Sequence, residues 1–220
     1  MEKLTRNNIV LLGCLSVLII FLPFLTSSRS LFLHLLLSAI IVSGVYSCAF
    51  QKRTQRILAT VGAITLVVTW LDIIFGQADV FRIVAFGAIF AFICAIVFFL
   101  VRHIARSKNV TSTIIISAIN GYLLMGLLGA LLLDIADTAG GSLTAGSGTP
   151  GIKFAGSAVP VFHDYLYFSF VTLTTLGYGD ITPASVATKS VALMIAVGGQ
   201  FYLTILIAML VGKYLSQKNR

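Results

Sequence analysis

The chain has 220 residues, of which 58% are hydrophobic and only 10% are charged. This composition is typical of membrane proteins and excludes a soluble globular domain. The formal net charge of +8 would by itself suit a nucleic-acid-binding protein, but the cations lie between apolar runs, which gives that class no support.

The apolar runs predict the fold class. Backbone polar groups in hydrocarbon need partners within the chain, so an apolar run of about 20 residues forms a helix. A half-length run at 162–175 predicts a re-entrant helix that enters the membrane without crossing it. We therefore expect an all-α membrane protein with six transmembrane helices, at residues 9–25, 31–50, 57–75, 81–101, 112–133 and 187–212.

The basic residues predict the orientation. If successive loops alternate between the two sides, eleven Lys and Arg residues lie on one side and four on the other. The cation-rich side is expected to be cytoplasmic, which places both termini in the cytoplasm of a multi-pass cell-membrane protein. An alternative is that the first run is a cleaved signal peptide, because Lys3 and Arg6 precede it and the small residues Ser28 and Ser30 follow it.

Residues 1–110 predict a four-span domain that ends in a linker. A voltage sensor carries a cation at every third position of one span, because charge has to cross the field. Here Arg82 is the only cation before Arg102 in the span 81–101. The domain therefore resembles a voltage-sensor domain in its number of spans but lacks the gating charges. The basic linker at 101–110 fits either binding to anionic lipid headgroups or ordinary cytoplasmic positive charge.

The second domain, residues 111–220, begins with the span 112–133. Small residues in this span permit close contacts between membrane helices, and they include Gly121, Gly126 and Gly129. Residues 134–159 are rich in glycine and predict a flexible extracellular loop. Asp134 and Asp137 at its start either concentrate cations nearby or are ordinary solvated charges.

The motif with the clearest chemistry follows the short run and reads Thr175-Leu176-Gly177-Tyr178-Gly179-Asp180. Consecutive backbone carbonyls point at one axis only if the backbone alternates between left- and right-handed conformations. Glycine adopts the left-handed conformation without steric cost, and Gly177 and Gly179 are separated by one residue, as this alternation requires. The alternative is a glycine-rich turn between two membrane helices.

This stretch resembles the selectivity filter and pore helix of the potassium channel family, whose filter reads T-V-G-Y-G. The chain differs from that pattern at Leu176. The resemblance implies a fourfold homotetramer, in which the carbonyl oxygens of four loops replace the water shell of K⁺. It places the K⁺ sites at Thr175, Leu176, Gly177 and Tyr178, with Gly179 completing the filter.

The resemblance also implies residues that support the filter. These are Thr174, Tyr167 and Asp180, with a hydrogen bond expected between the last two. Tyr178 is expected to point away from the axis and to brace the loop against the pore helix. Val171 stands where some members of the family have a carboxylate behind the filter, which leaves the stability of the outer end of the filter open.

The last run, 187–212, is implied to line the pore. Gly198 and Gly199 lie in its middle, and they serve either as a hinge or as a place where the filter-supporting helix comes close. A polar face, expected to meet a cavity or a partner helix, consists of Gln200, Thr204 and Ala208. A candidate hydrophobic gate consists of Leu203, Ile207 and Val211.

Together these features predict a potassium-selective channel that conducts passively and is not strongly voltage-gated. The alternatives are a weakly selective cation channel and a non-conducting membrane subunit. The expected partners are K⁺, membrane lipids and three further copies of the chain, without nucleic acid. No cofactor is expected besides the permeant K⁺, and no arrangement of residues favours an enzyme.

Overall fold

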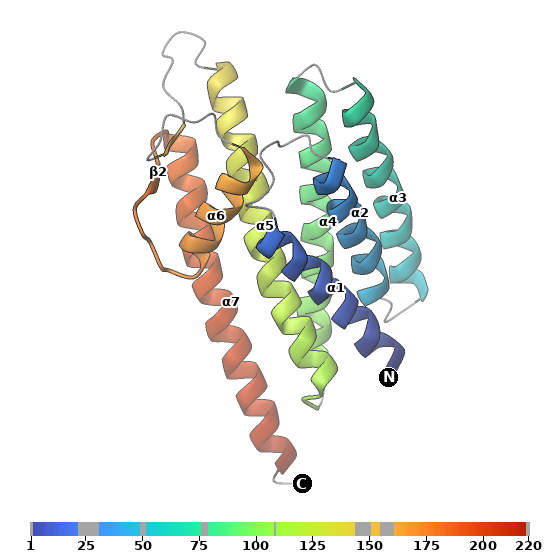
Figure 1. Cartoon of the computed structure of the whole chain (residues 1–220). Coiled ribbons are helices and arrows are strands. Elements are labelled where there is room, and N and C mark those ends of the chain that lie inside the picture. Colours follow the sequence, from blue (N-terminus) through green and yellow to red (C-terminus); the bar gives the residue numbers. More distant parts are fainter. Residues whose placement is uncertain are drawn as a thin grey trace.

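The computed structural model describes residues 2–21, 31–48, 52–75, 79–107, 109–143, 151–154 and 161–218. The C-terminal ends of two predicted runs, at 22–25 and 49–50, lie outside these residues, as does much of the glycine-rich segment. The described elements, in chain order (Figure 1), are α1 (Glu2–Phe21), α2 (Leu31–Ser47), α3 (Lys52–Phe75), α4 (Asp79–Arg106), α5 (Ser112–Leu143), β1 (Ile152–Phe154), α6 (Phe162–Leu173), β2 (Ile181–Pro183) and α7 (Val186–Lys218).

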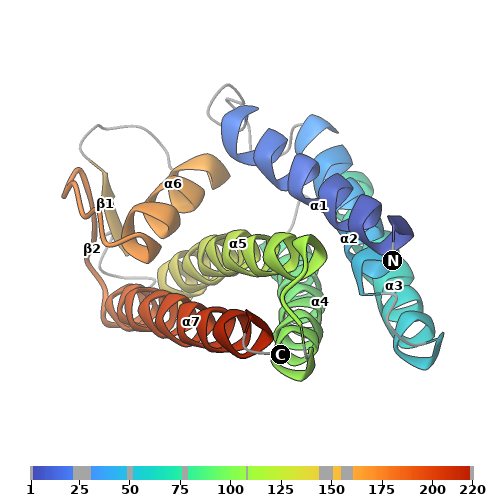
Figure 2. The same ribbon diagram turned by 90° about the horizontal axis from the view of Figure 1, so that it is seen from below.

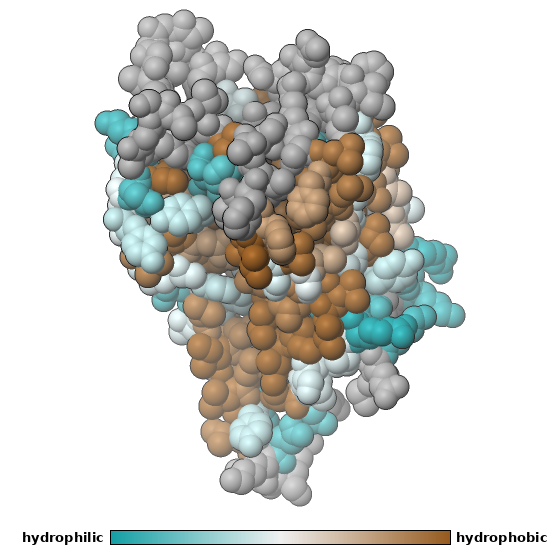
Figure 3. Space-filling view, in the orientation of Figure 1, coloured by the Kyte–Doolittle hydropathy of each residue, from teal (hydrophilic) through white to brown (hydrophobic). Residues whose placement is uncertain are grey.

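The helices have the lengths and compositions that a membrane requires. Five of those described, α1, α3, α4, α5 and α7, are long and apolar enough to cross a bilayer, and α2 is a shorter apolar helix of 17 residues. Hydrophobic side chains cover the middle of the face shown in Figure 3, and hydrophilic ones gather toward its edges. The chain is therefore a helical, multi-pass membrane protein, as the composition predicts.

Helix α5 lies at the centre of the bundle. It packs against α1, α4, α6 and α7, while α2 and α3 lie farther out (Figures 1 and 2). In the apolar stretch of α5, 61% of the residues are buried within the chain, compared with only 11% in α7. Most of the length of α7 is therefore available to lipid or to other chains.

Glycines explain how α6 and α7 approach α5 so closely. A Cβ at Gly126 would collide with the ring of Phe170 in α6, and one at Gly121 would collide with the hydroxyl of Tyr202 in α7. Gly129 faces Ser169 and the α7 side chain of Ile195 in the same way. The prediction that small residues in this span serve close helix packing is thus confirmed.

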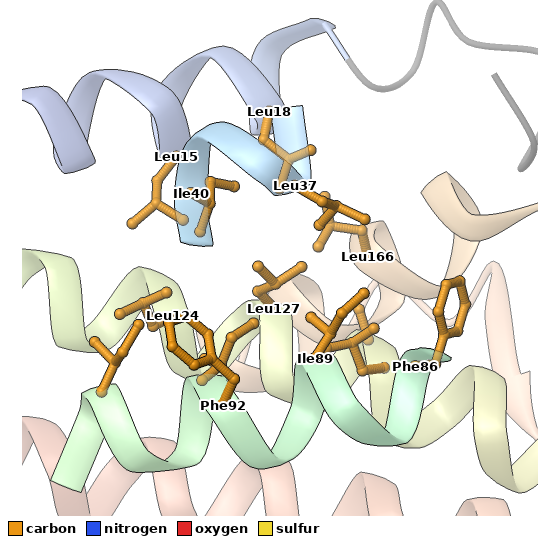
Figure 4. Close-up of a cluster of buried hydrophobic side chains, with 14 of the residues drawn as sticks. Leu15, Leu18, Leu37, Ile40, Phe86, Ile89, Phe92, Leu124, Leu127 and Leu166 are labelled. Carbon is orange, nitrogen blue, oxygen red and sulfur yellow. The ribbon is translucent and has the colours of Figure 1, made fainter. Parts of the chain in front are cut away.

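A single hydrophobic cluster joins the first four helices to the last three (Figure 4). Buried leucines of α1 and α2 face Phe92 and Ile89 of α4, and these meet Leu127 of α5 and Leu166 of α6. The cluster crosses the predicted domain boundary at residue 110, and that boundary stays a prediction.

Buried polar side chains add a second connection between α1 and α5. Ser117 donates a hydrogen bond to the side-chain oxygen of Asn8 at 3.2 Å, and Asn120 donates to the main-chain oxygen of Asn8 at 2.9 Å. All three residues are buried. Because a hydrogen bond inside an apolar bundle is costly to leave unmade, this cluster fixes the position of α1 on α5.

The largest difference from the predicted elements lies after residue 133. Helix α5 continues to Leu143, where the sequence predicts a flexible loop, and Asp134 is only 1% exposed. Asp137 accepts a hydrogen bond from Tyr165. Neither acid is therefore an ordinary solvated loop charge. The all-α prediction also omits β1 and β2, which form an antiparallel pair with Ile152 opposite Pro183.

Candidate ion-conduction site

The short helix α6 leads the chain into the site. Its N-terminal turn is closed by Asp164, whose carboxylate accepts a hydrogen bond from the N–H of Val161 at 2.9 Å. A carboxylate in the first turn is also favoured by the helix dipole. The helix starts in the upper half of the molecule and stops at Leu173, close to mid-height, after which the chain turns back to β2 (Figure 1). This is the re-entrant path that the short apolar run predicts.

The segment that follows α6 has an alternating backbone. The φ angles of Thr175, Gly177 and Gly179 are +60°, +58° and +81°, so every second residue is left-handed. Glycine accepts these angles readily, but a β-branched threonine does so only when its surroundings impose the conformation. The two glycines in the sequence predict that the alternation begins at Gly177. In the structure it begins two residues earlier, at Thr175.

The alternation separates the donors of this segment from its acceptors. The N–H groups of Leu176 and Gly177 point back to α6 and donate to the carbonyl oxygen of Val171, at 2.9 and 3.4 Å. Within the described part of the chain, the carbonyl oxygens of residues 175–178 accept no hydrogen bond. Unpaired carbonyl oxygens in sequence are the ligands that a dehydrated K⁺ needs.

Two neighbouring side chains hold the ends of this segment. Tyr167 donates a hydrogen bond to Asp180 at 2.8 Å, as the sequence predicts. At the inner end, the hydroxyl of Thr174 donates to the carbonyl oxygen of Phe170 at 2.7 Å and so caps the last turn of α6.

The segment stands apart from the rest of its own chain. Leu176 and Tyr178 are 55% and 67% exposed, and no atom lies within 4 Å of a Cβ built on Gly177 or Gly179. In Figure 1 the loop between α6 and β2 bulges away from the bundle. The expected bracing of Tyr178 against the pore helix is not seen within one chain, because most of its ring is uncovered. Most of this segment is therefore uncovered in the single chain.

Comparisons with known proteins agree with this geometry. A family model described as an ion channel matches residues 130–216. Two-pore potassium channel 4 of Arabidopsis thaliana is 38% identical over 68 residues, which cover 30% of this chain and 24% of that protein.

Residues 130–216 are therefore similar to an ion-channel family, and a part of the chain is similar to plant potassium channels. Two-pore potassium channel 3 of the same plant is 49% identical over 45 residues, or 20% of this chain and 10% of that protein. The matched segments thus span a quarter or less of these relatives. No solved structure matches the chain.

Within residues 130–216, the two central glycines of α7 have different surroundings. A Cβ at Gly199 would lie 2.8 Å from the main-chain oxygen of Leu173 and 2.6 Å from its Cδ1. A Cβ at Gly198 would meet only the end of Met125, at 3.6 Å. Gly199 therefore fits the predicted close approach of the filter-supporting helix, and α7 runs through both glycines as one helix.

The other predicted residues of α7 lie on surfaces that one chain leaves open. Of the candidate gate, Leu203 is half-buried against the bundle, whereas Ile207 and Val211 are exposed. The polar face of Gln200, Thr204 and Ala208 is exposed along its length. Only an assembly of chains would bring these positions together, so their roles stay predictions.

The structure also shows contacts of α7 that the sequence does not predict. Lys213, near the inner end of α7, donates to the carbonyl oxygens of Ile104 and Ala105 at the end of α4, at 2.6 and 3.0 Å. Higher up, Tyr202 donates to the carbonyl oxygen of Ala118 in α5 at 2.8 Å. Tyr202 lies within the predicted span and Lys213 comes directly after it, and only their partners, about 80 to 110 residues away, give them a role.

Proposed function

We propose that four copies of this chain form a potassium-selective channel that conducts K⁺ passively across the cell membrane. The carbonyl oxygens of Thr175, Leu176, Gly177 and Tyr178 would coordinate the ion, and Gly179 would complete the filter. The observation that carries this proposal is the alternating backbone of 175–179, whose carbonyl oxygens accept no hydrogen bond within the described chain. The relatives named as potassium channels support the choice of ion.

The fourfold assembly is proposed from what one chain lacks. A K⁺ site needs oxygens on all sides of an axis, and the chain contains one such loop. That loop and most of α7 are uncovered in the single chain. Closed cyclic symmetry is the usual way for identical chains to complete a shared site. Three further copies would cover Tyr178 and bring the exposed faces of α7 around one pathway.

The orientation follows from the charges. The two termini lie toward the same end of the molecule, and the filter loop lies nearer the opposite end (Figure 1). The basic residues near the termini and in the turns at that end favour the cytoplasmic side. We therefore place both termini in the cytoplasm and the outer end of the filter, at Asp180, outside the cell.

The proposal is tested by ion flux from proteoliposomes that contain the purified full-length chain. We expect K⁺ flux down its gradient, much smaller Na⁺ flux, and block by Ba²⁺. Equal Na⁺ and K⁺ flux would favour the weakly selective cation channel instead. No flux from protein that elutes as a tetramer would favour the non-conducting subunit.

Voltage dependence gives a separate prediction. The described part of α4 presents no series of cations, and the span 83–101 contains no charged residue. Because moving one charge across the membrane is worth about 2.3 kcal/mol per 100 mV, a helix without charges cannot drive steep gating. The conductance measured in bilayers is expected to change only weakly with voltage from about −150 to +150 mV. A steep sigmoidal activation curve would contradict this prediction.

A further inference from the structure

We infer that Asp137, Gly151 and Tyr165 form a clamp, here called the outer clamp, that keeps the filter in its conducting arrangement from outside the ion pathway. The inference rests on the proposed function, because it assigns positioning residues to the same filter. None of the three residues belongs to the filter motif or to its predicted supports.

The clamp begins at the end of α5. One carboxylate oxygen of Asp137 accepts a hydrogen bond from the hydroxyl of Tyr165 in α6, at 2.6 Å. The other oxygen lies against Gly151, since a Cβ on that glycine would be only 2.5 Å away from it. Tyr165 is buried. A single carboxylate therefore contacts both the helix that enters the filter and the segment that precedes β1.

Gly151 carries the connection to the other side of the filter. Its carbonyl oxygen accepts hydrogen bonds from the N–H groups of Ala184 and Ser185, at 2.8 and 3.0 Å, and from the hydroxyl of Thr188 at 2.5 Å. The antiparallel pairing of β1 with β2 continues this contact along the chain that leaves the filter. Gly151 is thus fixed to the filter exit and to the start of α7.

These contacts link the two ends of the filter segment to each other through residues outside the filter. The chain leaves α6 at Leu173 and enters β2 at Ile181, and the conducting segment between them has few contacts of its own. The clamp fixes α6 through Tyr165 and fixes the exit through Gly151, and Asp137 touches both. The separation of the two ends is set in this way. Carbonyl oxygens can surround an ion at a constant distance only if that separation is held.

The clamp supplies what the residue behind the filter lacks. Val171 is a buried apolar side chain, at the position where some potassium channels have a carboxylate. In this chain a hydrogen bond joins Tyr167 to Asp180 beside the filter, and this bond is solvent-exposed. The carboxylate of Asp137, paired with a buried tyrosine, holds the same region from the α5 side. We therefore expect the clamp to determine how long the filter conducts and to leave its ion preference unchanged.

The experiment measures current through purified full-length protein in planar bilayers under a maintained K⁺ gradient. Tyr165→Phe removes one hydroxyl and keeps the ring, and Tyr46→Phe makes the same change at an exposed position on α2. We expect current through Tyr165→Phe to decline on the order of tenfold faster than through the wild type, as for loss of a hydrogen bond to a charged group. Raising external K⁺ should slow that decline, because ions in the filter oppose its rearrangement. Tyr46→Phe should behave as the wild type.

A second set of variants separates the clamp from a general role in folding. Asp137→Ala should also give a rapid decline, and the double variant should be no faster than Asp137→Ala, because the hydrogen bond that Tyr165→Phe removes is already lost. Gly151→Ala should also decline rapidly, while Gly13→Ala, whose new methyl group meets open space, should not. All variants should elute as tetramers with wild-type K⁺ over Na⁺ selectivity in their initial current.

The outcomes distinguish the clamp from the proposed function. If the wild type does not conduct, the proposed function fails. If the wild type conducts and Tyr165→Phe declines at the wild-type rate, the clamp alone is wrong. The clamp is also wrong if external K⁺ does not change the rate of decline of Tyr165→Phe, or if the effects of Tyr165→Phe and Asp137→Ala on that rate are additive. It is equally wrong if Tyr165→Phe no longer elutes as a tetramer.

Discussion

Replacing Gly177 or Gly179 with alanine is expected to abolish potassium-selective flux. Both residues have positive φ, which costs an L-residue about 1–2 kcal/mol each. Four subunits would share the axis, so one substitution per chain adds about 4–8 kcal/mol to the conducting arrangement. The backbone can avoid this cost by rotating a peptide plane, which would turn a carbonyl oxygen away from the ion. K⁺ and Na⁺ flux from proteoliposomes, with tetramer content measured in parallel, tests the prediction.

The control for these variants is alanine at a glycine of ordinary helical conformation. Gly87 in α4 has open space around a new methyl group, as do both filter glycines in the single chain. The three substitutions therefore differ mainly in backbone conformation. Gly87→Ala is expected to conduct as the wild type does. Wild-type flux in Gly177→Ala and Gly179→Ala would show that 175–179 is an ordinary turn.

The second large effect is expected at Gly199, compared with its neighbour Gly198. The methyl group of Gly199→Ala would collide with the main-chain oxygen of Leu173, which no side-chain rotation relieves. Overpacking of this kind typically costs about 1–3 kcal/mol per site. Because Leu173 is the last residue of α6, the displacement passes directly to Thr174 and Thr175. We expect a tetramer of lower thermal stability and a K⁺ flux reduced by about tenfold or more, as an overpacking cost above 1.4 kcal/mol implies.

Gly198→Ala makes the same chemical change one residue earlier. Its methyl group would be in ordinary contact with Met125 at 3.6 Å, and alanine favours a helix by about 1 kcal/mol relative to glycine. This variant should be as stable as the wild type or more so, with flux retained. If Gly199 were only a hinge, the tetramer of Gly199→Ala would be as stable as that of Gly198→Ala. The two variants would then differ only in how readily the channel opens. That result would contradict the close-approach explanation.

Much of the fold could be predicted because each membrane helix is a local feature. An apolar run becomes a helix whatever surrounds it, since its backbone has no other partner in lipid. The extension of α5 to Leu143 could not be predicted in this way. Its residues include Asp134, Asp137 and two adjacent glycines, a composition typical of loops. In the structure Asp137 lies in this helix, and its carboxylate accepts a hydrogen bond from Tyr165 in a later helix, a contact that no local pattern indicates.

In the candidate site, too, local features could be predicted from the sequence and long-range contacts could not. The motif from Thr175 to Asp180 predicts the alternating backbone, because the glycines that permit it are visible in the sequence. The partners of Gly151 and Lys213 depend on which distant segments of the chain come together, and a single sequence contains no signal for those contacts. For Gly199 the sequence leaves two explanations open, a hinge or a close approach of the filter-supporting helix. The position of Leu173 beside Gly199 favours the close approach.

The short connection between α4 and α5 has a consequence for how the chains come together. Only residues 107–111 separate the two helices, which pack side by side within one molecule together with α1. In the proposed tetramer, the peripheral helices of each subunit would therefore rest on that subunit's own α5, without being exchanged with a neighbour. Each chain could then fold completely during insertion, and assembly of the proposed tetramer would need only the surfaces of α7 and the filter loop to meet.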